Sequence, residues 1–205
     1  MSPKSGFGYT SFDDKIYVAG GNDGKSILSD FDEYNTFKNS ATSLPKMITN
    51  RDEIGVTKSF DEEEIYAIGG FGGKSKSCLK SCERFSFERK CWEGIADLNS
   101  PRRALAAVCL KNGVYAIGGF NGTNYLATVE KYDAGANRWD FVASMKCGRC
   151  MVQAVASEDG RGIWVIGGFN NQPVKMIEYY DSEEDKWVTK SFGNKRRYMH
   201  SAIIA

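Results

Sequence analysis

Short apolar runs recur along this chain at a constant interval, and each of them ends in a pair of glycines. β-Branched and aromatic residues dominate these runs, which favours short strands that are covered on both faces. The runs and their glycines occupy 16–21, 65–70, 114–119 and 163–168, so that each glycine pair stands 49 residues after the previous one. A period of about 50 residues is typical of β-propeller blades and exceeds that of helical repeats.

A second pattern follows each apolar run and predicts two further strands. An acidic residue stands two positions before an aromatic residue, as in Glu130 and Tyr132, and a tryptophan follows seven positions later. Their regular spacing indicates core residues and not a ligand cage. In the first repeat, Ala41 stands at the tryptophan position, so either Phe37 replaces it from a shifted position or this unit lacks its packing anchor. The tryptophans are Trp92, Trp139 and Trp187.

A third pattern opens each unit after the first: a hydrophobic residue precedes an arginine by four positions, as in Met47 and Arg51, and a strand of small residues follows. These elements in fixed order resemble the kelch repeat, as found in the kelch-like proteins that recruit substrates to cullin-RING ubiquitin ligases. The resemblance covers nearly the whole chain. It implies an all-β fold, a kelch β-propeller of four-stranded antiparallel blades, with strand A innermost and strand D outermost. The glycine pair ends strand B, Glu-x-Tyr-Asp lies on strand C, and tryptophan marks strand D.

We expect one domain, a single kelch-repeat propeller region over residues 1–205. The predicted blades occupy about 6–46, 47–97, 98–144 and 145–191, and residues 192–205 begin a further blade. Kelch rings commonly have six blades, so the resemblance implies a partial or open ring of a larger propeller, with edge strands open to association. The alternative is a compact ring of four blades in which one strand A is displaced.

Composition and charge exclude several classes of partner. The chain has 27 basic and 26 acidic residues and a net charge of +1, so it lacks the basic excess that nucleic acid or an anionic membrane would attract. No apolar stretch approaches the roughly 18 residues of a membrane-spanning helix, and the N-terminal residues lead into no apolar signal core. We therefore expect a cytoplasmic protein with no nucleic-acid or membrane partner.

Six cysteines raise the question of metal or redox chemistry. A structural zinc site needs two C-x2-C pairs, or one pair with histidines, whereas this chain has only the pair Cys147 and Cys150 and the single histidine His200. Lys146 and Arg149 flank the pair, and nearby cations favour the thiolate, so one hypothesis is a redox-sensing thiol. The alternative is a set of ordinary reduced cysteines in a reducing compartment.

Catalytic chemistry finds little support in the sequence. A Ser-His-Asp or Cys-His arrangement and a multi-histidine metal centre all need more histidine than the chain provides. Residues 20–26 and 69–75 resemble a phosphate-binding loop, but both segments are one residue short and lead into a strand where that loop leads into a helix. We predict that the chain is not an enzyme and that it uses no cofactor or metal.

A residue that recurs in every blade would form a ring around the propeller axis, and four arginines fit this description. In kelch-like proteins the turn from strand D into strand A, where these arginines stand, forms the partner-binding face together with the B-to-C loops. Converging guanidinium groups would favour acidic or carboxylate-bearing peptides. The alternative is that each arginine braces its own blade by pairing with a loop carbonyl or an acid. The four residues are Arg51, Arg102, Arg149 and Arg196.

The B-to-C loops supply the other candidate contacts, because their sequences vary while their flanks repeat. Recognition is expected in loops on a fixed scaffold, where asparagine and tyrosine are useful contact residues. For each loop residue the alternative is an ordinary solvated turn. The candidates are Asn22, Asp23, Phe71, Asn121, Asn124, Tyr125, Asn170, Asn171 and Gln172.

The leading functional prediction is a non-catalytic protein-interaction module. It resembles the substrate-recognition domain of a cullin-RING ubiquitin-ligase adaptor, and the resemblance implies a protein or peptide ligand with a short acidic or polar, degron-like segment. Recruitment to a ligase would require sequence outside this chain. The alternative is a cytoskeletal scaffold that resembles actin-associated kelch proteins, and a third possibility is an enzyme that uses the propeller as a scaffold.

Overall fold

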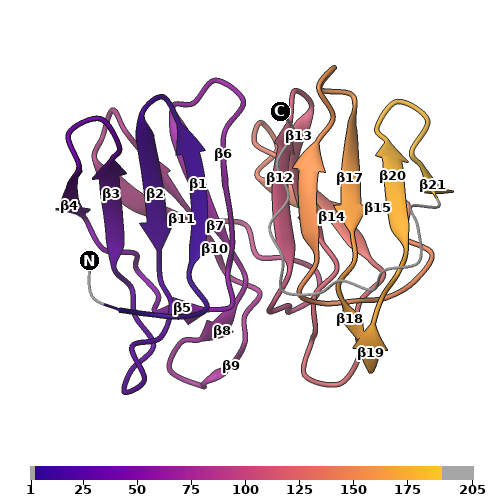
Figure 1. The fold of residues 1–205 in the computed structure, drawn as a ribbon, viewed down its shortest axis with the longest axis horizontal. Helices are drawn as coiled ribbons and strands as arrows, with labels where there is room; N and C mark the ends of the chain where they lie inside the picture. The colour runs from indigo at the N-terminus through magenta and orange to yellow at the C-terminus, as the bar shows by residue number, and fades with distance from the viewer. Residues whose placement is uncertain (1–2, 191–205) are drawn as a thin grey trace.

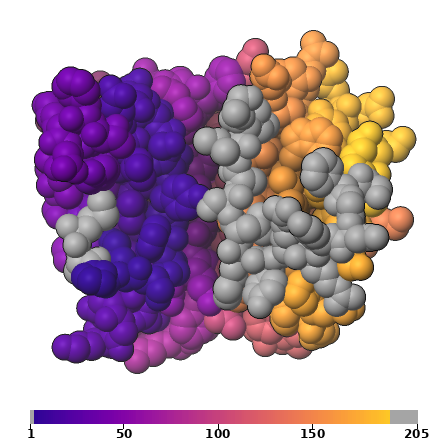
Figure 2. Space-filling model, viewed as in Figure 1, coloured from indigo at the N-terminus to yellow at the C-terminus, as the bar shows by residue number. Residues whose placement is uncertain are grey.

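The computed structural model describes residues 3–190, and every regular element in that range is a β-strand. Four antiparallel sheets of four strands each follow one another along the chain. Figure 1 shows them side by side, the first two in indigo and purple and the last two in pink to yellow, and the space-filling view has the same division (Figure 2). The all-β architecture of four-stranded antiparallel blades is therefore confirmed.

Each blade is an up-and-down meander whose strands lie in chain order. The first blade consists of β1 (Gly8–Phe12), β2 (Lys15–Ala19), β3 (Phe31–Asn35) and β4 (Ser40–Leu44). The second consists of β6 (Gly55–Lys58), β7 (Glu64–Ile68), β10 (Cys82–Ser86) and β11 (Cys91–Ile95). The third consists of β12 (Ala106–Leu110), β13 (Gly113–Ile117), β14 (Val129–Asp133) and β15 (Arg138–Val142). The fourth consists of β16 (Gln153–Ala156), β17 (Gly162–Ile166), β20 (Ile177–Asp181) and β21 (Lys186–Lys190).

Five two-residue strands lie at one end of the blades, at the bottom of Figure 1. They belong to the B-to-C loops and the D-to-A turns. A three-stranded sheet joins β5 (Arg51–Asp52), β8 (Phe71–Gly72) and β9 (Ser77–Cys78), and a hairpin joins β18 (Phe169–Asn170) to β19 (Gln172–Pro173). Backbone hydrogen bonds in these short sheets thus give the predicted interaction loops a defined conformation.

The innermost strands β1, β6, β12 and β16 are the A strands, and consecutive ones pack against each other. Together they line a central cavity of about 600 Å³. Three apolar clusters fill the remaining space, and one of them joins Tyr17 and Phe31 of the first blade to Ile65 and Trp92 of the second. The core therefore lies both within the blades and between neighbouring blades.

The glycine pairs are required because the backbone of the next blade approaches them closely. Gly69 has φ of +57°, and a Cβ atom there would lie 2.5 Å from the carbonyl oxygen of Arg102 in the following turn. The second glycine, Gly70, donates its N–H to that same oxygen at 2.8 Å. The repeated pair is thus a contact point between blades, and glycine is the residue that tolerates both the left-handed conformation and the close approach.

The tryptophans of the D strands also join neighbouring blades. Each indole Nε1 donates to a carbonyl of the preceding blade or of the turn that follows it: Trp92 to Pro45 at 2.9 Å, Trp139 to Ala96 at 3.0 Å and Trp187 to Ala143 at 2.8 Å. Trp92 and Trp139 are buried and Trp187 is half-buried, so their role in the core is confirmed.

The first blade lacks this anchor. Ala41 occupies the tryptophan position on β4, opposite Tyr34. Phe37 lies in the C-to-D turn with 86% of its surface exposed, so it does not substitute for the tryptophan. The residues predicted to begin a further blade, 192–205, lie outside the described residues, and both the number of blades and the closure of the ring remain predictions.

Candidate partner-binding face

Three of the repeated arginines lie inside their blades. The exposed fraction of Arg51, Arg102 and Arg149 is 0%. Arg102 is representative: its Nη1 donates to the carbonyl oxygens of Gly118 at 2.8 Å and Thr128 at 3.0 Å, and its Nη2 lies 2.5 Å from Glu130 Oε1. Each guanidinium therefore ties the glycine pair to strand C of its own blade.

The other two arginines repeat this pattern. Arg51 donates to the carbonyl oxygen of Gly69 at 2.8 Å and lies 2.7 Å from Glu83 Oε1. Arg149 donates to the carbonyl oxygen of Gly167 at 3.0 Å and pairs with Glu178. The recurrence of arginine and of the strand-C glutamate is therefore explained by one buried ion pair per blade.

The glutamates also hold the D-to-A turns in place. Glu83 accepts the backbone N–H of Ile48 at 2.7 Å and that of Thr49 at 3.0 Å. Glu130 accepts the N–H of Asn99 at 2.6 Å and that of Ser100 at 3.1 Å. A buried carboxylate needs such partners because desolvation otherwise disfavours its charge.

Arg51, Arg102 and Arg149 do not present their guanidinium groups around an open mouth, as the ring hypothesis expected, because their side chains are buried. Burial lowers the pKa of Arg102 and of Arg149, and the facing Glu130 and Glu178 oppose that shift. Both guanidinium groups pair with these carboxylates inside the blade. We therefore assign Arg51, Arg102 and Arg149 to bracing, the alternative that the sequence left open; Arg196 lies outside the described residues.

A fourth ion pair of this kind involves residues that the sequence analysis did not select. Lys4 Nζ lies 3.3 Å from Asp32 Oδ2, and the two side chains are only 3% and 10% exposed. A signal for it exists: Lys4 precedes Gly20 by 16 positions, as Arg102 precedes Gly118. The change from arginine to lysine concealed the match. The first blade thus carries a lysine–aspartate version of the brace.

Several of the predicted loop residues stabilise their own turns. Asn22 Oδ1 accepts the N–H of Gly24 at 2.8 Å, and Asn121 Oδ1 accepts the N–H of Asn124 at 2.7 Å. Asp23 accepts two backbone N–H groups of its loop, and these hydrogen bonds lower its pKa. These are Asx turns, in which the side chain shapes the loop.

The remaining predicted loop residues differ in how far they reach the surface. Asn170 is half-buried, and its Nδ2 donates to the carbonyl oxygen of Gly148 at 2.6 Å. Phe71 and Tyr125 are half-buried, and Tyr125 packs against Phe120 with ring centroids 5.2 Å apart. The exposed members of the set are Asp23, Asn124, Asn171 and Gln172.

Arg103 is the arginine that reaches the rim of this face, and the sequence analysis did not select it. Its guanidinium carbon lies 5.4 Å from the ring centre of Phe71 and 5.5 Å from that of Phe120. Its Nη1 lies 3.2 Å from Glu53 Oε2, and the two side chains are 35% and 30% exposed. The sequence does contain a signal for an aromatic contact at this face, because a phenylalanine follows the glycine pair at 71, 120 and 169.

The D-to-A turns meet in a rim of backbone hydrogen bonds. Glu53 N–H donates to the Gly6 carbonyl, Ala104 N–H to that of Glu53, and Met151 N–H to that of Ala104, each at 2.8 Å. These four residues help to line a mouth cavity of about 410 Å³. The rim joins the four blades at the end where the loops gather.

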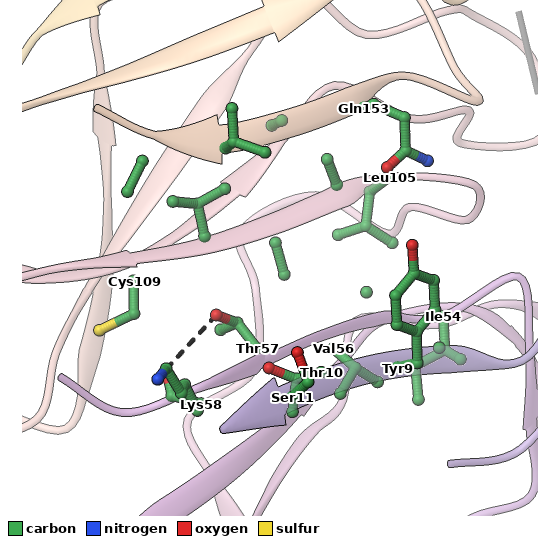
Figure 3. Close-up of a pocket in the computed structure, with 18 of the residues that line it drawn as sticks. Tyr9, Thr10, Ser11, Ile54, Val56, Thr57, Lys58, Leu105, Cys109 and Gln153 are labelled. Atoms are coloured by element: carbon green, nitrogen blue, oxygen red, sulfur yellow. Dashed lines mark hydrogen bonds between the residues drawn. The ribbon is translucent and has the colours of Figure 1, made fainter. Parts of the chain in front are cut away.

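Beyond the mouth, the central cavity has mixed walls. Figure 3 shows Thr10 and Ser11 of β1 together with Thr57 and Lys58 of β6 on one side, and Leu105 and Cys109 of the third blade on the other. Burial raises the pKa of the Cys109 thiol to about 11. The side formed by β1 and β6 is polar, and its cation Lys58 is paired with Glu62.

Cys150 of the fourth blade has the opposite environment to a sensor thiol. Cys150 is buried, and burial raises its pKa, whereas a reactive thiol requires a lowered value. Cys147 is half-buried, and Asn170 Nδ2 lies 3.4 Å from its sulfur.

Within residues 3–190, no group of three or more His, Cys, Asp or Glu residues is placed to hold a metal ion. No helix in this range could cross a membrane.

Comparisons with known proteins bear on the family. Residues 6–205 match the family model described as the KLHDC2/KLHL20/DRC7 Kelch-repeats domain. Kelch-like protein 7 of Rattus norvegicus is 33% identical over 55% of this chain and 19% of its own length. Kelch-like protein 35 of Mus musculus is 27% identical over 86% of this chain and 30% of its own.

A third relative, Kelch repeat and BTB domain-containing protein 8 of Rattus norvegicus, is 28% identical over 87% of this chain and 31% of its own length. The chain thus spans less than a third of each of these relatives. The match to the family model extends over nearly the whole sequence and agrees with the four-stranded blades, the glycine pairs and the D-strand tryptophans. The chain belongs to the kelch-repeat family, as a kelch-repeat domain of the kind found in kelch-like proteins.

Proposed function

We propose that this domain is a protein-interaction module that holds an acidic or polar segment of a partner on the face formed by the B-to-C loops and D-to-A turns. The observation that carries the proposal is the uneven distribution of charge between the two ends of the blades. The net charge of +1 does not reveal this asymmetry, because the basic and acidic residues of the chain nearly balance in number.

Exposed lysines gather at the end that carries the B-to-C loops and D-to-A turns. Within the described residues only Lys46 among them forms an ion pair, with Asp30 at 2.8 Å. The acidic side chains of this end are Asp23, Asp30, Asp52, Glu53 and Asp97. The exposed lysines are Lys25, Lys46, Lys74, Lys76, Lys80, Lys146 and Lys175.

The A-to-B and C-to-D turns at the opposite end have the reverse balance. Their basic residues are Lys38, Arg89, Lys90, Lys111 and Arg161. Their acidic residues are Asp13, Asp14, Asp61, Glu62, Glu63, Glu88, Glu158, Asp159, Glu183, Glu184 and Asp185. An acidic segment that approaches the domain is therefore drawn to the loop face and repelled by the other end, because such fields steer encounter and suppress wrong orientations.

Binding can be tested with two pools of fluorescein-labelled 12-residue peptides. In one pool half of the positions are Asp or Glu; in the other the same positions are Asn or Gln. We expect the domain to prefer the acidic pool in fluorescence anisotropy. The double variant Lys74→Glu/Lys76→Glu should weaken that binding, whereas Glu183→Lys/Glu184→Lys at the opposite end should not. Equal binding of the two pools would refute the proposed preference.

Family membership supports a second layer of this proposal, in which the bound partner is a substrate delivered to a cullin-RING ubiquitin ligase. Affinity capture with the full-length protein, followed by detection of a cullin and of ubiquitylated partners, tests this role. If the protein instead sediments with actin filaments, and Lys74→Glu/Lys76→Glu does not change that, the cytoskeletal scaffold is the better description.

A further inference from the structure

Two neighbouring arginines of the third blade have opposite environments. Arg102 is fully buried and uses its guanidinium for carbonyl groups and for Glu130. Arg103 is half-exposed at the rim, between Phe71 of the preceding blade and Phe120 of its own. Successive residues of an extended chain point to opposite sides, so one arginine braces the blade while the next faces the partner-binding side.

The guanidinium of Arg103 is held in place but keeps its hydrogen-bond donors available. Its only ion pair in the described part of the chain is the contact with Glu53, and no hydrogen bond from its side chain to residues 3–190 is formed. The two aromatic rings restrict its motion through cation–π contacts. A planar cation that is already oriented loses little entropy when it pairs with a carboxylate.

The aromatic clamp itself is fixed by the fold. Arg103 and Phe120 exchange backbone hydrogen bonds of 3.0 and 2.9 Å, and Phe120 packs against Tyr125 at 5.2 Å between ring centroids. Phe71 pairs with Asp52 through β8 and β5. The clamp therefore spans the second and third blades and would move only if both moved.

Glu53 is the internal competitor for the same cation. Its carboxylate lies beside Asp52, and burial raises its pKa while Arg103 partly offsets that shift. The ionisable groups around it from the packed elements are Asp52, Arg103 and the thiols of Cys78 and Cys150, and burial raises the pKa of both thiols. A carboxylate of the partner would thus have to compete with Glu53, which already pairs with the guanidinium of Arg103.

We infer that Arg103 is the specificity-determining residue of this face: it pairs with a carboxylate side chain of the bound segment, and Glu53 tunes the affinity by competing for the same guanidinium. This inference rests on the proposed function. It adds to it a named contact, because the lysines act through their field whereas Arg103 offers a planar, pre-oriented fork.

The test measures binding of the acidic and amide peptide pools to the full chain and to its variants. Arg103→Gln should weaken binding of the acidic pool roughly tenfold to a hundredfold, as expected for the loss of a charge-assisted hydrogen bond. Arg103→Lys should recover only part of the loss, because lysine lacks the fork. Glu53→Gln should strengthen binding about two- to fivefold.

The opposite signs for Arg103 and Glu53 separate recognition from a structural role, since breaking a purely structural pair would weaken binding from either side. Arg161→Gln, an exposed arginine of an A-to-B turn, serves as the matched control and should change nothing. If the acidic pool is preferred and Lys74→Glu/Lys76→Glu weakens it while Arg103→Gln does not, the Arg103 assignment is overturned and the proposed function stands. If the wild-type domain shows no preference between the pools, both are overturned.

Discussion

At the scale of single residues, the recurring arginines show how burial changes the meaning of a repeated charge. A guanidinium in the interior is tolerated because Glu130, Gly118 and Thr128 replace the water that Arg102 loses. Two of these arginines each keep one unsatisfied donor: within the described residues, the Nε atoms of Arg102 and Arg149 have no acceptor. The ion pair of Arg102 and Glu130 is structural, and removing one partner would leave the other as an uncompensated buried charge, which is strongly destabilising.

Replacing Arg102 with Met should destabilise the domain by about 3–5 kcal/mol, because Glu130 would remain buried without its cation. Equilibrium unfolding in urea, followed by tryptophan fluorescence, measures the change. Arg103→Met is the control: its ion pair is partly solvated and should contribute less than about 1 kcal/mol. Similar losses in the two variants would contradict the distinction between the bracing and the rim arginine.

At the scale of the strand and its turn, the glycine pair connects local sequence to the packing of blades. Gly118 has φ of +62°, and an added Cβ atom would lie 2.6 Å from the carbonyl oxygen of Arg149. That oxygen also accepts the N–H of Gly119 at 2.9 Å. The position therefore combines a conformational requirement with a steric one, and both recur in successive blades.

The two requirements can be separated by comparing two glycines. Gly24 has φ of +87° but no atom within 4 Å of an added Cβ, so Gly24→Ala should cost only the left-handed strain, roughly 1–2 kcal/mol. Gly118→Ala should cost about 3 kcal/mol or more, because the contact with Arg149 must also open. Thermal or urea unfolding of both variants checks this. An equal loss at the two positions would show that the approach of the next blade is unimportant.

At the scale of the whole molecule, a nearly neutral chain is electrically polarised. The lysines of the loop end and the acids of the opposite end lie at opposite ends of the same blades, because antiparallel strands return alternate connections to each end. The field of such a molecule acts over a distance that salt controls, about 8–10 Å at physiological ionic strength. Recognition at the loop face should therefore begin with steering.

Raising the salt from about 20 mM to about 500 mM should slow association of the acidic peptide pool by roughly tenfold or more, whereas the amide pool should respond weakly. Stopped-flow anisotropy gives the rate constants directly. Arg103→Gln should act mainly on dissociation, since it removes a contact and leaves the lysine field nearly intact. A salt response that is the same for both pools would argue against steering.

Much of the fold was predictable because its signals are local. The apolar runs, the glycine pairs and the tryptophan spacing each report the demands of a strand, a left-handed turn or a buried ring, and these demands repeat with the blade. The fate of Phe37 was not predictable, since its sequence allowed both substitution for the tryptophan and exposure. Lys4 was missed for another reason: its spacing to Gly20 matches that of Arg102 to Gly118, but it is a lysine where the later blades have arginine, and its partner Asp32 lies 28 positions away in the chain.

The sequence by itself determined that this protein is an array of kelch blades and the order of the four strands in each blade, because every repeat has the same physical requirements. Only the tertiary structure decided which arginines are internal and that Arg103 is partly exposed at the loop end. Arg102 and Arg103 are neighbours in the sequence, yet Glu130 encloses one and Phe71, from another blade, holds the other at the rim. Burial depends on residues brought together by the fold, and a repeat pattern alone does not distinguish an arginine that braces a blade from one that stays at the surface.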